Sequence, residues 1–239
     1  MLSILKKEIN SFFSTPIGYL VLGVFFVLNG LFLWIFDNQF NILNAGFADL
    51  NSFFFLAPWI FIFLISAVTM KSFSDELSTG TFEILKTRPI GLNNIILGKY
   101  LAGIALIVLA IIPTLTYVYT ISALGNPKGN FDSGSLIGSY LGLLLLVLTY
   151  CSIGIFSSTL SKNQIVAFIT STLLCLFLFL GFDFMSSLFG SDAYFIENLG
   201  LNQHYKSISR GVFDSRDFIY FISISFFFLV LTKFRLDRE

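Results

Sequence analysis

Residues 136–158 read LIGSYLGLLLLVLTYCSIGIFSS and contain no Asp, Glu, Lys or Arg. A helix of about 20 predominantly apolar residues crosses a hydrocarbon core of about 30 Å. Residues 143–148, LLLLVL, lack the alternation of apolar and polar residues that is typical of a membrane β-barrel strand. The stretch therefore predicts a membrane-spanning helix and argues against a barrel.

The whole chain shares this apolar character. Its 239 residues include 56% hydrophobic and 12% charged residues, whereas a soluble domain carries about 45–50% apolar and roughly 25% charged residues. So little charge cannot coat a water-facing surface. The composition favours a single integral membrane domain over residues 1–239, surrounded by the lipid bilayer.

Six stretches have uncharged interiors and approach or reach the length of a spanning helix. They are Ile17–Phe36, Phe53–Met70, Leu101–Ser122, Leu136–Ser158, Ile165–Phe182 and Phe218–Thr232. The last has only 15 residues and covers about 22 Å, so we expect a thinned bilayer there or a helix that extends into residues 212–217. The expected fold class is an all-α integral membrane protein with six transmembrane helices.

Lysine and arginine residues are unevenly distributed between the predicted loops. With a cytoplasmic N-terminus, four of the 14 fall outside: Lys128, Lys206, Arg210 and Arg216. The other ten fall inside: Lys6, Lys7, Lys71, Lys86, Arg88, Lys99, Lys162, Lys233, Arg235 and Arg238. Because cytoplasmic loops are enriched in Lys and Arg, we predict that both termini are cytoplasmic.

The residues before the first span have the pattern of an amphipathic helix. Apolar residues recur every three to four positions, at Leu2, Leu5, Ile9, Phe12 and Phe13. The opposite face carries Lys6, Lys7, Glu8 and Asn10. We predict an interfacial helix that ends at Pro16, which turns the chain into the membrane. It serves either as a simple anchor or as an elbow that also contacts a partner.

The segment between the second and third spans, residues 71–90, reads KSFSDELSTGTFEILKTRPI. Its polar start can extend the second helix as far as Gly80, which can cap a second short helix with Glu83 in the first turn. Pro89 ends that helix. Phe82 and Leu85 form an apolar edge with Ile84 beside it, while Glu83, Lys86 and Arg88 face away.

This short helix allows two interpretations. It is either a solvated connector that rests on lipid or an element that docks on a protein partner. Charges of both signs surround its apolar edge, which suits a protein groove better than an anionic lipid surface.

A long connection, residues 186–217, precedes the last span. We predict two short external helices that separate near Gly200, because structureless loops of this length are uncommon; a mobile loop is the alternative. The chain's single histidine, His204, lies here, and we expect its side chain to be solvated.

The sequence offers little material for catalysis. With one external histidine, the spans lack the parts of a zinc, haem or Ser–His site. Gly98-Lys99 is followed by Tyr100, so it does not complete a phosphate-binding loop; we expect Lys99 to mark the cytoplasmic start of the third span. We therefore predict no enzyme activity, cofactor or metal.

Polar residues within the spans are uncharged. We expect them to bond helix to helix rather than to line a substrate path: Asn29, Ser66, Thr69, Thr114, Thr116, Thr149, Ser152, Thr170, Ser171 and Thr172. Cys151 and Cys175 are predicted to be buried as small apolar side chains.

Two segments carry a family resemblance. Residues 73–76 (FSDE), 80–90 (GTFEILKTRPI) and 97–99 (LGK) together resemble the cytoplasmic segment of the ABC-2 type permeases of ABC transporters. Residues 209–221, SRGVFDSRDFIYF, are similar to the C-terminal segment of the same branch. Size and these segments look closest to the gliding-motility-associated permeases of Bacteroidetes.

The resemblance implies a permease subunit in the inner (plasma) membrane that works with a separate ATP-binding cassette ATPase subunit and a second permease copy or related permease, without a nucleic-acid partner. ATP hydrolysis on the ATPase would drive export or mechanical work, here in gliding motility. The alternative is a scaffold subunit of a motility or secretion complex that transports nothing.

The resemblance also implies which residues couple the permease to its ATPase. The segment that matches the family's coupling helix, with the acidic pair before it, includes Asp75, Glu76, Gly80, Thr81, Phe82, Glu83, Leu85, Arg88 and Pro89.

Overall fold

The computed structural model describes residues 1–44, 46–87, 90–189 and 194–238. The regular secondary structure of these residues is entirely helical, and six helical stretches among them are long and apolar enough to cross a membrane. The predicted all-α fold with six spans is confirmed. The stretches are Gly18–Ile35, Asn51–Thr79, Leu92–Leu124, Ser133–Leu160, Gln164–Leu188 and Ser215–Leu236.

Most spans combine consecutive helical segments. Span 1 comprises α2 (Pro16–Gly30) and the π-helical turn η1 (Leu31–Ile35), and span 2 comprises α3 (Asn51–Thr69) and α4 (Lys71–Thr79). Span 3 comprises α6 (Leu92–Ile111), the 3₁₀ turn η3 (Ile112–Thr114) and α7 (Leu115–Leu124), and span 4 is α8 (Ser133–Leu160). Span 5 comprises α9 (Gln164–Leu176), the π-helical turn η4 (Phe177–Gly181) and α10 (Phe182–Phe189), and span 6 is α13 (Ser215–Leu236). The shorter helices are α1 (Leu2–Phe13), η2 (Ile42–Asn44), α5 (Thr81–Lys86), α11 (Tyr194–Glu197) and α12 (Leu201–Ser209).

The sixth span is longer than expected. α13 has 22 residues, which correspond to about 33 Å. Asp214 caps its first turn by accepting a hydrogen bond from the Arg216 backbone N–H. At the other end the helix continues through Lys233 and Arg235 to Leu236. The span predicted from the sequence ends too early, at Thr232. Long basic side chains can extend toward the membrane surface while their backbone stays helical.

α8 forms the centre of the bundle and contacts α3, α9, α12 and α13. Two glycines on α8 allow this close packing. A Cβ at Gly154 would lie 2.1 Å from Oγ1 of Thr69 on α3, and a Cβ at Gly142 would lie 2.9 Å from the ring of Tyr205 on α12. Small residues at such positions let helix backbones approach one another within a membrane.

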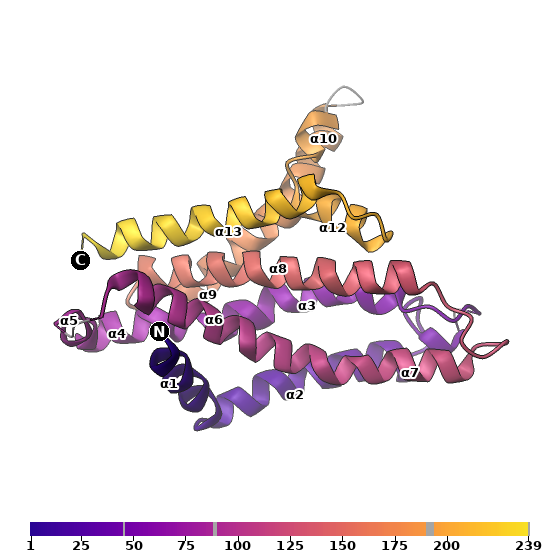
Figure 1. Ribbon diagram of the computed structural model, residues 1–239, viewed down its shortest axis with the longest axis horizontal. Helices are drawn as coiled ribbons and strands as arrows, with labels where there is room; N and C mark the ends of the chain where they lie inside the picture. Colours follow the sequence, from indigo (N-terminus) through magenta and orange to yellow (C-terminus); the bar gives the residue numbers. More distant parts are fainter. Residues whose placement is uncertain (45, 88–89, 190–193, 239) are drawn as a thin grey trace.

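The two ends of the bundle differ. α4, α5, the last residues of α13 and, close by, α1 lie at one end, and α7 and the loops next to it lie at the other (Figure 1). We call these the α5 end and the α7 end. α10 leads away from the bundle (Figure 1).

α12 lies across the packed helices near the α7 end. The buried Tyr205 hydroxyl donates to the Phe54 carbonyl on α3 at 2.8 Å, and the hydroxyls of Ser135 and Ser139 on α8 donate to the Ser209 carbonyl at 2.9 and 3.2 Å. Burial raises the pKa of the Tyr205 hydroxyl far above its ordinary value, so it stays a neutral donor. The division predicted near Gly200 separates α11 from α12.

The polar residues of the spans behave in two ways. Ser66 and Ser171 join α3 to α9 at 2.8 Å, and Thr149 and Ser225 join α8 to α13 at 3.2 Å. Others bond within their own helix, as the Thr69 hydroxyl does to the Ile65 carbonyl. Helix-to-helix bonding therefore accounts for only some of them. Cys151 and Cys175 are buried and unpaired with each other.

Candidate functional site

A sharp corner joins α4 to α5 at Gly80. Its φ of +71° is left-handed, and no atom lies within 4 Å of the position that a Cβ would take. Glycine is favoured because this conformation strains residues with a side chain. The Thr79 hydroxyl donates to the Asp75 carbonyl at 2.8 Å and lies 2.9 Å from the Thr81 hydroxyl. The corner turns α5 away from the line of span 2.

One edge of α5 is held by the rest of the chain. Phe82 is buried and meets the buried Phe73 of α4 edge to face, with ring centroids 6.0 Å apart. The Lys86 ammonium lies 5.1 Å from the Phe82 ring centroid and donates to the Leu236 carbonyl of α13 at 2.9 Å. Leu85 is half-buried. The Phe82–Leu85 edge thus packs inward.

The other face of α5 is open. Thr81, Glu83 and Ile84 are exposed, and Ile84 retains 62% of its accessible surface. An apolar side chain beside a carboxylate at the end of a bundle is chemically suited to a groove in a protein partner. Arg88 and Pro89 lie outside the described residues.

The acidic pair before the corner has two different roles. Asp75 is exposed and accepts a hydrogen bond from the Gln164 amide at the start of α9, at 3.0 Å. Glu76 is largely buried, and its Oε1 accepts from Lys99 at 2.9 Å and from Lys7 at 3.3 Å. The pair therefore ties α4 to α9 on one side and to α1 and α6 on the other.

Lys99 does not mark the start of a span, contrary to expectation. α6 begins seven residues earlier, at Leu92, and the Lys99 side chain is only 2% exposed. Its ammonium donates to Glu8 Oε1 at 2.9 Å, Glu76 Oε1 at 2.9 Å and the Ser72 carbonyl at 2.6 Å. The Gly98-Lys99 pair belongs to the segment that carries the family resemblance, and this was the sequence signal for Lys99. Nothing in the local sequence indicates the partners of the Lys99 side chain.

Gly98 explains how α1 reaches this cluster. A Cβ at Gly98 would lie 3.0 Å from Cβ of Ile4 and 3.2 Å from the Met1 carbonyl oxygen. The buried Ile4 thus rests directly on the α6 backbone. α1 therefore contacts protein as well as presenting apolar side chains outward.

His204 is not a solvated side chain, also contrary to expectation. Nδ1 lies 2.6 Å from Oδ1 of Asp217, and Nε2 lies 2.9 Å from the Asn198 carbonyl oxygen. The ring stacks on Tyr220 with centroids 3.9 Å apart. His204 on α12 thus binds the first turn of α13, a contact between residues 13 apart that their sequence spacing does not reveal.

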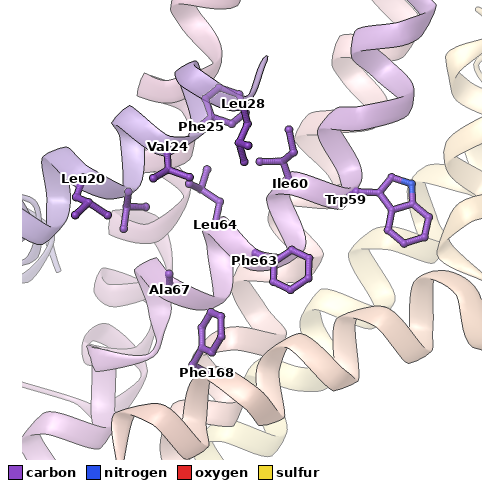
Figure 2. A pocket seen from close by; sticks show the side chains of 11 residues that line it. Leu20, Val24, Phe25, Leu28, Trp59, Ile60, Phe63, Leu64, Ala67 and Phe168 are labelled. Carbon is purple, nitrogen blue, oxygen red and sulfur yellow. The ribbon is translucent and has the colours of Figure 1, made fainter. Parts of the chain in front are cut away.

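Two neighbouring hollows open between the helices near Trp59. An apolar groove of about 420 Å³ lies between α2, α3 and α9, with Val24, Phe63 and Phe168 among its lining residues (Figure 2). A hollow of about 360 Å³ between α3, η4 and α12 shares Trp59 with it. Across the part of the chain that the structure describes, no group of three or more His, Cys, Asp or Glu side chains is placed to hold a metal ion.

The chain was compared with known proteins. A family model described as "ABC-2 family transporter protein" matches residues 2–209. The match extends from α1 through α12 and includes the α4–α5 corner, Gly98 and Lys99. A search of curated proteins finds no match.

Proposed function

Because the chain belongs to the ABC-2 transporter family, we propose that it is the permease subunit of an ABC transporter whose ATP is hydrolysed on a separate ATP-binding cassette subunit. It is a multi-pass membrane protein with six spans. A permease of this kind performs mechanical work, so its own residues bind, position and move rather than catalyse.

The exposed face of α5 is the observation that carries this proposal. Phe82 and Lys86 hold one edge of α5 against α4 and α13, while Glu83 and Ile84 face outward at the end of the bundle. A short helix fixed on one side and open on the other can receive force from a partner and pass it to the spans. The ATPase would bind the open face.

The distribution of charge supports one orientation of the chain in the membrane. We assign the α5 end to the cytoplasm, because the ten basic residues predicted to be inside belong to α1, the α4–α6 region, the α8–α9 loop and the end of α13. Both termini are then cytoplasmic, in the inner membrane of a bacterium. A second permease copy or a related permease completes the transporter, and its use is in gliding motility.

Replacing Ile84 by Glu tests the docking role of α5. The variant places a charge in the centre of the proposed contact without touching the buried edge. We expect co-purification with the proposed ATP-binding cassette subunit to fall about tenfold, as for loss of a central interface residue. Phe47→Glu is the matched control, because Phe47 is also apolar and exposed but follows η2 in the connection between spans 1 and 2.

Unchanged co-purification of both variants would contradict the docking role.

The scaffold interpretation makes a different prediction. A complex that forms and works fully with an ATPase lacking its Walker lysine would show that the chain anchors rather than transports.

A further inference from the structure

Lys99 joins three separate elements at one point. It lies on α6, and its ammonium contacts Glu8 of α1, Glu76 of α4 and the Ser72 carbonyl of α4. An ammonium has three N–H donors, and these three acceptors use all of them. The Lys99 ammonium also lies 5.1 Å from the centroid of the buried Phe73 ring. α1, α4 and α6 are thus fastened to one another at the α5 end.

The surrounding charges make Lys99 the centre of this cluster. Glu8 and Glu76 approach the same ammonium, and their side chains are only 22% and 13% exposed. Two neighbouring carboxylates in a largely buried site repel one another unless a cation lies between them. Removing one member of a buried ion pair leaves an uncompensated charge, so loss of the Lys99 ammonium would break the ionic contacts of α6 with α1 and α4.

Lys7 provides a second, weaker connection that does not include α6. Its ammonium lies 3.3 Å from Glu76 Oε1 and 3.9 Å from Glu8 Oε1, and its side chain is 63% exposed. Lys7 therefore links α1 to α4. Without Lys99, α1 and α4 would remain connected through Lys7 while α6 would lose its ionic contacts with both.

We propose that Lys99 is a positioning residue for force transmission: it fastens α6 to α1 and α4, so that a displacement of α5 reaches span 3. The inference rests on the proposed function, because it concerns what happens when an ATPase moves α5. A different route leads from α5 to span 6, through the bond from Lys86 to the Leu236 carbonyl. Loss of Lys99 should therefore weaken transmission to span 3 and leave span 6 responsive.

The test compares reporters on the two spans. Tyr119 on α7 is 79% exposed and Ile219 on α13 is 63% exposed, so Tyr119→Cys and Ile219→Cys each accept a bimane fluorophore. The two native cysteines are buried and will not be labelled in the folded protein. The signal is the fluorescence change when ATP, magnesium and orthovanadate are added to the complex of the full chain with its ATP-binding cassette subunit in nanodiscs.

In Lys99→Met we expect the response at position 119 to fall about fivefold, while the response at position 219 and co-purification with the ATPase stay near those of the parent protein. Lys99→Arg should retain most of the response at position 119, because the cation remains. Lys162→Met is the matched control, since Lys162 is exposed at the junction of α8 and α9.

A disulfide between α1 and α6 tests whether Lys99→Met has lost only the connection between these helices rather than its fold. The Cβ position at Gly98 lies 3.0 Å from Cβ of Ile4, close to the roughly 3.5–4.5 Å of a disulfide. In Lys99→Met with Ile4→Cys and Gly98→Cys, oxidation before labelling should restore the response at position 119. It re-joins α6 to α1, which Lys7 still connects to α4, and a reductant should abolish the gain.

An unchanged response at position 119 in Lys99→Met, or an equal fall at positions 119 and 219, would overturn the inference. In both cases the parent complex still responds to nucleotide, so the proposed function survives. Absence of any nucleotide response in the parent complex would overturn the proposed function together with the inference.

Discussion

At the scale of single residues, His204 and Asp217 form a polar contact at the junction of α12 and α13. Nε2 of His204 donates to the Asn198 carbonyl, while Oδ2 of the buried Asp217 has no hydrogen-bond partner. The Asp217 carboxyl group therefore depends on His204 for its side-chain hydrogen bond. A buried polar group that loses its partner retains the cost of desolvation, so this contact is sensitive to changes on either side.

Replacing His204 by Ala should lower the free energy of unfolding by about 1–3 kcal/mol, because Asp217 then has no partner. Thermal and denaturant unfolding in detergent would measure the loss. Gln203→Ala, on the same helix, should change it by less than about 0.5 kcal/mol. In an Asp217→Ala background, which removes the group that would be left unpaired, the cost of His204→Ala should shrink. An equal cost in both backgrounds would show that the contact contributes nothing.

At the scale of elements, the α4–α5 corner shows what the local sequence can and cannot predict. Gly80 and Glu83 indicated a short capped helix because capping depends on residues within one turn, and the structure places α5 at Thr81–Lys86. The inward packing of Phe82 depends on Phe73 and α13, so the apolar edge, which the sequence placed against either lipid or a protein partner, instead faces the chain itself.

Long-range contacts explain why the environment of Lys99 could not be predicted from the sequence. Lys99 meets Glu8 across 91 residues and Glu76 across 23, and no periodicity or motif spacing encodes such pairs. Six spans were predictable because an uncharged stretch of sufficient length is a local property. The ends of α6 and α13 were not, because both helices continue beyond the apolar core into charged or polar residues.

Replacing Gly80 by Ala should disturb the corner without unfolding the spans. The left-handed backbone makes an added Cβ cost about 1 kcal/mol, and the corner can relieve that strain by opening. Gly129→Ala is a matched control, because Gly129 also has a positive φ and nothing within 4 Å, but it precedes α8 rather than α5.

We expect both glycine variants to show a similar small loss of thermal stability, whereas only Gly80→Ala should co-purify less ATP-binding cassette subunit. Equal co-purification of the two variants would mean that the angle of α5 is unimportant for docking.

At the scale of the whole molecule, a net charge of zero conceals a strong asymmetry. The basic residues gather toward the α5 end, where Lys7, Lys86 and Lys99 also make the contacts that hold α1, α5 and α6. The same charges thus favour one orientation in the membrane and fasten the elements that would receive force. Under the proposed function, orientation and force transmission would both depend on one charge distribution.

The proposed orientation predicts which single cysteines react from outside the cell. Phe47→Cys should react with a membrane-impermeant maleimide in intact cells, whereas Ile84→Cys should react only after the membrane is opened, because a positively charged end is retained in the cytoplasm. Both native side chains are exposed, so access depends on the side of the membrane rather than on burial. The native cysteines are buried, and the unsubstituted protein measures their background. Labelling of Ile84→Cys in intact cells would reverse the orientation and place α5 out of reach of a cytoplasmic ATPase.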